Sequence, residues 1–338
     1  MRTFLLLFCI FLILPAHICL GTNRQHLVIS SDGYAYIRLK DNKSKSELVK
    51  YDIQKKGKQA YGVKRFNNSC TFLGENSSDL QGDKTAILYG CTSPSKKDIL
   101  SYRLIVVDTK TGQEIISLNN GRTFAFSPKN NAIVYVEEIP GERGSAPPPG
   151  YNAGVWLYDF NSKAKKQISK MDAPYIDLNW SEHDGNIYFT NGRVVCKYNA
   201  QSGIMTETAY KGIYFSPDGR YYIYHPVTGE GDSEIYRTSD NKRMIEWETS
   251  IRKRGKYNVM SFQFWSKKLD AVAFFVGKDT NVLFDINQGE VIAEFSGYIV
   301  IGTNADGTLV AVRPYVEDYL SIVEIINLLD ILSKPGMK

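Results

Sequence analysis

The stretch Phe-Ser-Pro-Asp-Gly-Arg-Tyr-Tyr-Ile-Tyr at residues 215–224 decides the fold, because looser copies of it recur along the whole chain. Each copy joins a tight polar turn to an aromatic or β-branched strand, which is the pattern of a β-hairpin. Self-similarity along a chain indicates a repeat architecture. The turns of the copies begin at Ser30, Ser127, Ser181, Ser216, Ser266 and Asn304.

The spacing of these turns predicts the size of one repeat. The long interval 30–127 holds one further unit, whose strands begin near Cys70 and Thr85. With that unit included, the repeats average about 46 residues, and a propeller blade takes about 40–50. We therefore expect seven blades. Six blades are the alternative, because residues 321–332 fit an amphipathic helix as well as a hairpin; we favour a strand through Ile326.

A second signature fills the other half of each unit. Its clearest copy is Leu-Ile-Val-Val-Asp-Thr-Lys-Thr-Gly-Gln-Glu-Ile at 104–115, an apolar strand, a polar turn and another strand. Asp, Asn, Gly and Ser in such turns favour a reversal of the chain. The sequence thus predicts an all-β protein, a β-propeller of four-stranded blades that forms a single domain over residues 22–338.

The Phe-Ser-Pro-Asp-Gly phrase followed by an aromatic strand resembles the WD-like repeat of the TolB-type propellers and of the propeller domains of prolyl oligopeptidases. The resemblance covers most of residues 24–330, and the 215–224 copy carries it best. It implies the propeller fold. It implies no particular activity, because one fold serves many functions.

The first 21 residues have the order of a secretory signal peptide. Arg2 precedes an apolar run over 4–14, and Cys19 and Gly21 supply small residues for cleavage. The run is too short for a membrane-spanning helix of about 20 residues. We expect a periplasmic or secreted protein that does not span the membrane. Lipidation at Cys19 is an alternative, against which the large Ile18 argues.

The cysteines fit an exported protein. Cys70 and Cys91 fall at the ends of two strands that we expect to be antiparallel neighbours, within disulfide range. We favour a disulfide there over two buried thiols. Cys196 lies in a predicted strand and fits an apolar filler. No spacing of metal ligands is present in the sequence, so we expect no metal and no cofactor.

The net charge of +5 gives no argument for nucleic acid as a partner. The search for catalytic motifs finds no Gly-x-Ser-x-Gly elbow and therefore no hydrolase of the prolyl oligopeptidase type. His225, with Glu230 and Asp232 in the following loop, is a candidate channel or metal site. A solvated loop histidine is the more common situation.

Loop lengths point to one face of the propeller. The segments 91–101, 137–154 and 225–233 are expanded connections between second and third strands, and 250–257 connects two blades on the same face. Loops lengthen where function lies on a rigid scaffold. The candidate partner-binding residues are Glu137, Glu138, Arg143, Tyr151, Arg252 and Arg254.

Two functions from different classes follow. The first is a monomeric, non-catalytic propeller that binds a protein or peptide in the cell envelope or outside the cell through its long loops. The second is an enzyme, a hydrolase or lyase acting on a glycan or peptide, or a small-ligand binder, that uses the central channel. The expanded loops and the scarcity of catalytic residues favour the first.

Overall fold

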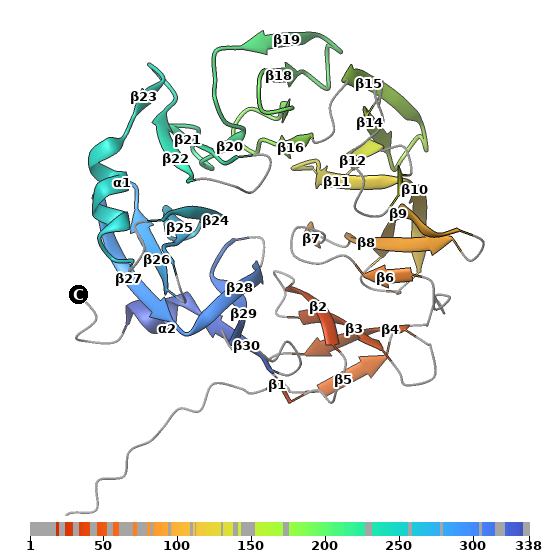
Figure 1. The fold of residues 1–338 in the computed structure, drawn as a ribbon, viewed down its shortest axis with the longest axis horizontal. Helices are drawn as coiled ribbons and strands as arrows, with labels where there is room; N and C mark the ends of the chain where they lie inside the picture. Colours follow the sequence, from red (N-terminus) through yellow and green to blue (C-terminus); the bar gives the residue numbers. More distant parts are fainter. Residues whose placement is uncertain are drawn as a thin grey trace, which may run out of the picture.

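The chain folds into antiparallel sheets arranged around a ring (Figure 1). The described strands form seven sheets, of which six have four strands each and one has six. Successive strands of a sheet are neighbours in the sequence, and the first strand generally lies nearest the centre of the ring. The prediction of an all-β propeller built from four-stranded sheets is confirmed.

The structure is a computed structural model. It describes residues 18–19, 24–29, 34–40, 46–52, 57–60, 70–72, 80–81, 84–93, 96–108, 111, 113–129, 131–137, 141–142, 153–171, 176–226, 232–255, 259–277, 280–303, 306–314 and 322–333. Before Arg103 the description covers the backbone, together with the side chain of Lys84.

We number the sheets 1 to 7 in chain order. Sheet 1 contains β2 (Arg24–Ile29), β3 (Tyr34–Lys40), β4 (Ser46–Asp52) and β5 (Gly57–Ala60). Sheet 2 contains β6 (Cys70–Phe72), β7 (Leu80–Gln81), β8 (Lys84–Ser93), β9 (Lys96–Asp108) and β10 (Glu114–Asn119), with β13 (Gly141–Glu142) added at β9. Sheet 3 contains β11 (Gly121–Phe126), β12 (Ala132–Glu137), β14 (Ala153–Asp159) and β15 (Lys165–Met171). Sheet 4 contains β16 (Asp177–Trp180), β17 (Ile187–Thr190), β18 (Val195–Tyr198) and β19 (Met205–Thr208).

The two helices of the described chain follow the strands of sheets 5 and 7. Sheet 5 contains β20 (Tyr214–Phe215), β21 (Tyr221–Tyr224), β22 (Glu234–Arg237) and β23 (Lys242–Arg243), and helix α1 (Ile245–Arg252) follows it. Sheet 6 contains β24 (Ser261–Ser266), β25 (Ala271–Phe275), β26 (Thr280–Asp285) and β27 (Glu290–Ser296). Sheet 7 contains β28 (Tyr298–Thr303), β29 (Leu309–Pro314), β30 (Ile322–Asn327) and β1 (Ile18–Cys19), and helix α2 (Leu328–Leu332) ends the described chain.

The serine of the repeated phrase closes the turn between the first two strands of a sheet. The Ser216 amide donates to the Tyr221 carbonyl at 2.9 Å, and the Ser216 hydroxyl accepts the Tyr221 amide at 3.0 Å. Gly219 has a φ of 71°, a left-handed conformation that costs glycine least. The serine is buried at 3% exposure or less in each described copy, namely Ser127, Ser181, Ser216 and Ser266.

The second signature forms the turn between the third and fourth strands. The Asp285 carboxylate accepts the backbone amides of Asn287 at 2.7 Å and Gln288 at 2.8 Å. This side chain therefore replaces the backbone in the turn, which explains why the signature requires Asp or Asn there. The same role falls to Asp108, Asp159 and Asn199.

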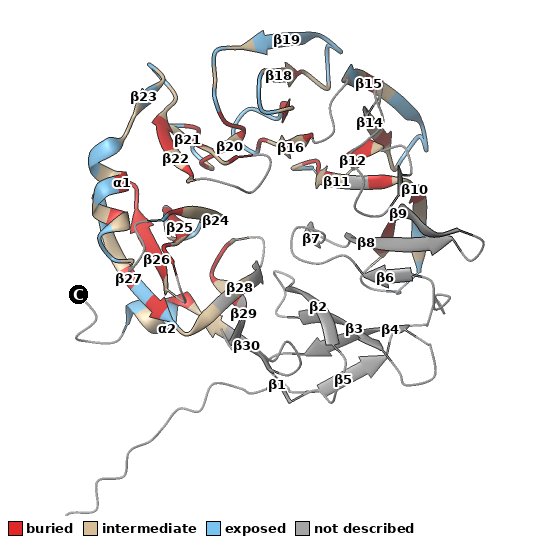
Figure 2. Ribbon diagram, viewed as in Figure 1, coloured by how far each residue is buried: buried red, intermediate tan, exposed pale blue. Residues whose placement is uncertain are grey.

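The core lies between neighbouring sheets, and it buries mainly second and third strands such as β12, β17 and β26 (Figure 2). One cluster joins sheets 3 and 4 through side chains such as Val134 and Phe189. Another joins sheets 5 and 6 through Ile223, Val272 and Phe274. Burying each such side chain stabilises the fold by about 1.5–3 kcal/mol. Sheet-to-sheet packing thus holds the repeats in a ring.

Helix α1 departs from the expected pattern, because we expected a loop between two units near residues 250–257. Strand β23 stops at Arg243, and the Glu248 side chain then accepts the Ile235 amide of β22 at 2.9 Å. The helix therefore satisfies a strand edge that a longer fourth strand would otherwise pair. Its Trp247 ring packs against Tyr221 and Phe284, with centroids 4.9 and 5.2 Å away.

The end of the chain follows the prediction of a strand through Ile326. Strand β30 extends to Asn327, whose side chain accepts the Leu329 amide at 3.1 Å and begins α2. The outer neighbour of β30 is β1, with Ile18 opposite Val323. The predicted signal peptide includes β1, so its removal would leave β30 as the outer strand of sheet 7.

Candidate functional site

One end of the ring carries the connections from second to third strands and those from one sheet to the next. We call it the long-loop end. There the β8–β9 hairpin continues to its tip, and β13 from the 137–154 segment pairs with it, Gly141 opposite Leu100 and Glu142 opposite Ile99. Within the expanded 137–154 connection, the structure therefore has a short strand. Two segments from neighbouring sheets therefore form one continuous piece of sheet.

The candidate partner-binding residues differ in their surroundings. Glu137 pairs with Lys165 at 2.5 Å, and Arg254 pairs with Glu294 at 3.0 Å in an exposed contact. Arg252 is largely buried, with 15% of its side chain exposed. The other site residues chosen from the sequence lie outside the described residues: Glu138, Arg143, Tyr151 and Glu230.

The cysteine prediction is tested at the level of the backbone. Strands β6 and β8 are antiparallel neighbours, and their register places Cys70 directly opposite Cys91. The disulfide itself stays a prediction, because these two side chains lie outside the described ones. Cys196 is buried, as expected of an apolar filler.

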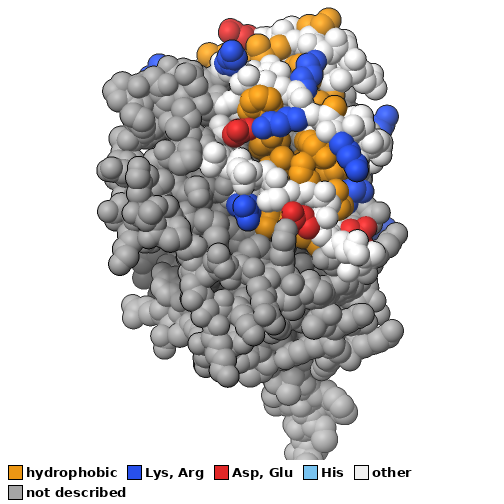
Figure 3. Space-filling view, turned by 90° about the vertical axis from the view of Figure 1, so that its right-hand side faces the viewer, with side chains coloured by type: hydrophobic (Ala, Val, Ile, Leu, Met, Phe, Trp, Pro, Cys, Tyr) orange, Lys and Arg blue, Asp and Glu red, His pale blue; other side chains and the backbone are white. Residues whose placement is uncertain are grey.

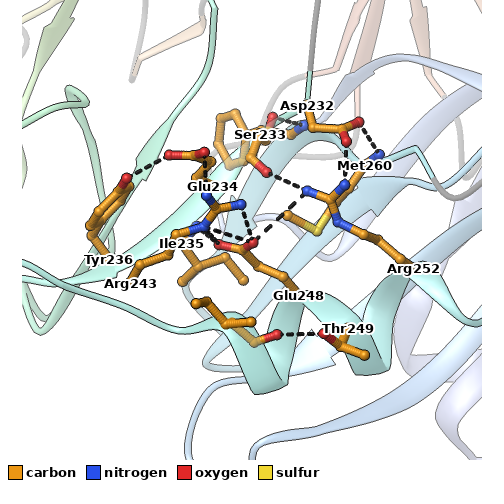
Figure 4. A network of polar contacts seen from close by, with 12 residues as sticks. Asp232, Ser233, Glu234, Ile235, Tyr236, Arg243, Glu248, Thr249, Arg252 and Met260 are labelled. Atoms are coloured by element: carbon orange, nitrogen blue, oxygen red, sulfur yellow. Dashed lines mark hydrogen bonds and ion pairs between the residues drawn. The ribbon is translucent and has the colours of Figure 1, made fainter.

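A polar network joins the long-loop end to helix α1 (Figure 4). The Asp232 carboxylate forms an ion pair with Arg252 and accepts the Met260 amide at 3.0 Å. The Arg252 guanidinium also lies 3.8 Å from the Glu248 carboxylate. Asp232 therefore faces an arginine and a backbone amide, and it fixes the end of the 225–233 loop against α1.

Glu248 is the centre of this network. Its side chain is 4% exposed, and its carboxylate accepts hydrogen bonds from Arg243 at 2.7–3.1 Å. Arg243 also forms an ion pair with Glu234 at 2.6 Å, and Glu234 accepts the Tyr236 hydroxyl at 2.5 Å. Hydrogen bonding to Glu248 raises the pKa of Arg243, so the guanidinium stays charged. Each buried charge has an opposite charge beside it, which makes the network a structural one.

His225 contacts Ser233 across the same loop. The His225 Nδ1 atom lies 2.9 Å from the Ser233 hydroxyl oxygen, which accepts the Phe262 amide at 2.8 Å. Burial lowers the pKa of His225, so its ring is neutral at pH 7. Ser233 has 0% exposure. The contact thus ties sheet 5 to the first strand of sheet 6.

A second carboxylate lies between sheets 4 and 5. Asp177 begins β16 and Tyr214 begins β20, so both follow a sheet-to-sheet connection and lie at the long-loop end. The Tyr214 hydroxyl donates to the Asp177 carboxylate at 2.5 Å, and the Leu178 amide donates to its other oxygen at 3.0 Å. Protein atoms surround the pair, yet both residues keep a solvent-exposed edge.

Burial raises the pKa of Asp177 to about 6, although the hydrogen bonds from Tyr214 and Leu178 act in the opposite direction. Burial also raises the pKa of Tyr214, and the neighbouring Asp177 charge raises it further. The Tyr214 ring lies 5.1 Å from that of Phe262, whose amide contacts Ser233. A series of contacts from Asp177 to His225 therefore links sheets 4, 5 and 6 at the long-loop end.

The described residues hold no group of three or more His, Cys, Asp or Glu side chains that could bind a metal. His225 and Asp232, chosen together from the sequence, face different partners, Ser233 and Arg252. Among the described helices none is both long and apolar enough to span a bilayer.

The outer side of the ring carries basic and aromatic side chains together. Lys165 lies 4.1 Å from the Trp156 ring centroid and 5.6 Å from that of Tyr135. Lys166 lies over Tyr198 in the next sheet at 5.6 Å. Figure 3 shows basic side chains among hydrophobic ones on this side of the molecule. These contacts place positive charge on the outer strand β15, and charged side chains on an edge strand disfavour its pairing with another chain.

Asp177, Tyr214 and Glu248 were not among the residues predicted from the sequence. Asp177 carries a weak signal, because a charged residue opens an inner strand that is otherwise apolar or neutral. Tyr214 is one of many tyrosines in strands, and nothing in the sequence distinguishes it. Glu248 was missed because its function depends on α1, which the repeat pattern did not predict.

No protein-family model matches this sequence, and no curated protein matches it. Solved structures do resemble the fold. The β-propeller domain of the Trilobed protease from Pyrococcus furiosus, described as having an open velcro topology, is 14% identical with a TM-score of 0.57, covering 93% of this chain and 99% of that one. Acylaminoacyl peptidase from Pyrococcus horikoshii is 12% identical with a TM-score of 0.59, covering 92% of this chain and 53% of that one.

This chain therefore spans about half the length of that peptidase. The β-propeller domain of Cps50 (Swd1) from Myceliophteria thermophila is 8% identical with a TM-score of 0.55, covering 92% of this chain and 100% of that one. At such identities a likeness establishes the fold and leaves the activity open. The chain has the fold of these β-propeller domains.

Proposed function

We propose that this chain is a non-catalytic β-propeller that binds a protein or peptide through its long-loop end. The observation that carries the proposal is the pairing of β13 with β9, which joins long segments from two neighbouring sheets. A surface whose backbone is already ordered loses less conformational entropy on binding. Binding residues on loops held by a rigid scaffold are common in propellers and sandwiches.

The polar residues at this end support a binding role over a catalytic one. Ser233 has 0% exposure, so its hydroxyl cannot reach a substrate despite its contact with His225. Asp232 faces Arg252 and the Met260 amide. A nucleophile needs both access and a positioned base, and the Ser233–His225 pair lacks the access.

The finer parts of the proposal rest on the sequence. The signal-like segment 1–21 supports a periplasmic or secreted location, with a partner in the cell envelope or outside the cell. The Phe-Ser-Pro-Asp-Gly repeats support a relation to TolB-type propellers. A disulfide between Cys70 and Cys91 would fit an oxidising compartment. We propose that the protein acts as a monomer.

The alternative is a small-ligand binder or an enzyme that uses the central channel. The observation that favours it is the presence of Asp177 and His225 at the long-loop end, because burial raises the pKa of Asp177 to about 6 and lowers the pKa of His225. Groups with such shifted pKa values gather at functional sites. Native mass spectrometry tests it: a bound metal or small molecule that is lost on His225→Ala would favour this alternative.

Affinity co-purification of the tagged mature protein from its own host's envelope fraction tests the main proposal. The loop variant carries Arg143→Ala and Tyr151→Ala in the 137–154 segment. The matched control carries Lys129→Ala and Ile204→Ala, a cation and an apolar side chain that are exposed in turns at the opposite end of the ring.

We expect a stoichiometric partner that wild type and control retain and that the loop variant loses by at least about tenfold, since aromatic and arginine residues dominate binding energy. Quantitative mass spectrometry measures the enrichment. Equal enrichment by the loop variant would show that the long-loop end does not bind the partner. If no form of the protein enriches a specific partner, the channel alternative is favoured.

A further inference from the structure

We propose that the outer edge of β19 binds an extended peptide segment as an added antiparallel strand. The charge of the segment specifies it further, because an acidic side chain fits opposite Met205. This inference goes beyond the proposed function: β19 lies on the outside of the ring (Figure 1), whereas the proposed partner binds at the long-loop end. The edge is a second surface, which recognises the main chain of its ligand first and the side chains second.

Strand β19 is the last strand of sheet 4, and among the described strands β18 is its only neighbour. The Asn199 amide donates to the Ile204 carbonyl at 2.9 Å, which makes these residues a hydrogen-bonded pair. Such pairs alternate with non-hydrogen-bonded ones in an antiparallel ladder. The backbone of Thr206 therefore bonds to β18. The amide and carbonyl groups of Met205 and Glu207 point away from β18, toward the outside of the sheet.

These outward backbone groups determine what kind of ligand fits. Met205 and Glu207 each present one donor and one acceptor, and they are every second residue of the strand. An extended backbone matches this spacing, because an antiparallel strand exchanges both hydrogen bonds with every second residue opposite it. Exposed sheet edges capture peptide segments in this way. The side chains of Met205, Thr206 and Glu207 are exposed, Met205 at 48%, which leaves room for such a segment.

The other outer strands have features that oppose pairing with another chain. Strands β5 and β15 contain lysines, and helix α1 follows the short β23. Helices α1 and α2 both contact β27, and β1 pairs with β30. Strand β10 has no lysine, but most of its side chains are half-buried or buried. Lysines and covering segments protect natural sheet edges, whereas β19 has the sequence Met-Thr-Glu-Thr and no helix follows it.

The preference for an acidic side chain comes from Lys166. Directly opposite residues of an antiparallel pair point to the same face. Tyr198, opposite Met205, belongs to the cluster between sheets 3 and 4, and the Lys166 Nζ atom lies 3.0 Å from the Tyr198 hydroxyl. A residue of the added strand opposite Met205 therefore shares a face with this cation. Glu207 points to the same face, so the residue opposite Glu207 should be uncharged.

Synthetic pentapeptides test the edge without any partner. The parent probe is acetyl-Thr-Val-Thr-Glu-Val-amide, whose antiparallel register places valine opposite Glu207 and glutamate opposite Met205. The reversed probe has lysine in place of the glutamate. The blocked probe is N-methylated at its second and fourth residues, whose amides would donate to β19. Its matched control is N-methylated at the third residue, whose amide would face away from β19.

NMR of the backbone amides in the full-length mature protein measures both binding and hydrogen exchange. We expect the parent probe and the matched control to bind with a Kd of about 1 mM and to slow exchange at the Met205 and Glu207 amides. The blocked probe should bind at least about tenfold more weakly, because two hydrogen bonds are lost. The reversed probe should bind about threefold more weakly, and Lys166→Gln should abolish the preference for the acidic probe.

Glu207→Pro removes one outward amide and leaves the ladder to β18 intact, because proline is tolerated where the amide of an edge strand faces solvent. It should lower the affinity for the parent probe about fivefold. Glu207→Gln, which removes the same charge and keeps the amide, should not lower it. Equal binding of the blocked probe and its matched control would overturn the proposal. That comparison uses the wild-type protein, so it stays decisive if Glu207→Pro does not fold.

Hydrogen exchange in the free protein tests whether the edge is open. Slow exchange at the Met205 and Glu207 amides without any probe would overturn the proposal. If that protection grows with protein concentration, the edge pairs with a second copy of the chain; if it does not, another segment of the same chain covers the edge. The loop variant with Arg143→Ala and Tyr151→Ala should bind the parent probe like the wild type, so this edge and the long-loop end are tested separately.

Discussion

Glu248 and Asp177 are both carboxylates inside the protein near the long-loop end, yet their surroundings differ. Each accepts one backbone amide, from Ile235 at 2.9 Å and from Leu178 at 3.0 Å respectively. Glu248 also faces the guanidinium groups of Arg243 and Arg252. Asp177 has a tyrosine hydroxyl in their place.

The ion pairs of Glu248 stabilise the fold, whereas the charge of Asp177 costs free energy to bury. Removing one charge from a buried ion-pair network leaves its partners without a counter-charge, which destabilises the protein. None of the described cations pairs with Asp177, so removing its charge should relieve the cost of burying it. The two acids should therefore respond to neutralisation in opposite directions.

Glu248→Gln should give the largest effect, a loss of about 3 kcal/mol in the free energy of unfolding. The amide leaves Arg252, which is 15% exposed, without its full counter-charge and weakens the bidentate contact to Arg243. Urea unfolding measures it. Glu246→Gln, an exposed neighbour in the same helix, should change stability by less than about 0.5 kcal/mol. Equal stability of the two variants would show that the network around Glu248 contributes nothing.

Asp177→Asn should act in the opposite direction and stabilise the protein by about 2 kcal/mol at pH 7.5. The folded pKa of about 6 lies above the ordinary value of 3.8, so the folded state binds more protons between these values and loses stability as pH rises through about 6. Neutral asparagine avoids that loss. Urea unfolding at pH 4 and pH 7.5 measures the difference between variant and wild type.

Near pH 4 the two proteins should be equally stable, because Asp177 is then protonated in the folded state. A loss of stability at pH 7.5, or the same difference at both pH values, would mean that the carboxylate is compensated after all. Such a result would place Asp177 in the same class as Glu248 and end the contrast.

The fold was accessible from sequence because its signals are local. The serine and glycine of 215–224 and the turn aspartate at 285 act within five residues of themselves, and such interactions repeat with the sequence. The propeller class and the β30 strand followed from them. Helix α1 did not, because Trp247 and Glu248 depend on contacts with sheets 5 and 6 rather than on a helix signal.

The candidate site was accessible only in part. Arg252 and Asp232 were both chosen from the sequence, but for separate roles, and the structure joins them as an ion pair. That contact requires Asp232 at the end of the 225–233 loop to lie against α1, and no local sequence pattern predicts this arrangement. Asp177 and Tyr214 are separated by 37 positions and meet because neighbouring sheets pack side by side. Pairings of this kind come from the closure of the ring.

Two tyrosines that donate to carboxylates, Tyr214 to Asp177 and Tyr236 to Glu234, give the smallest expected effects. Tyr214→Phe should cost about 1 kcal/mol at pH 7.5, since its hydroxyl donates to a carboxylate that forms no ion pair with a described side chain. Tyr236→Phe should cost less, because Glu234 keeps its ion pair with Arg243 at 2.6 Å. Urea unfolding of both variants measures the difference.

The carboxyl pKa provides the sharper readout for Tyr214. Its hydrogen bond lowers the pKa of Asp177 against the effect of burial, so Tyr214→Phe should move that pKa above 6. NMR titration of the Asp177 carboxyl carbon measures the shift, and Tyr236→Phe should leave it in place. An unchanged pKa in Tyr214→Phe would mean that another group supports the charge of Asp177.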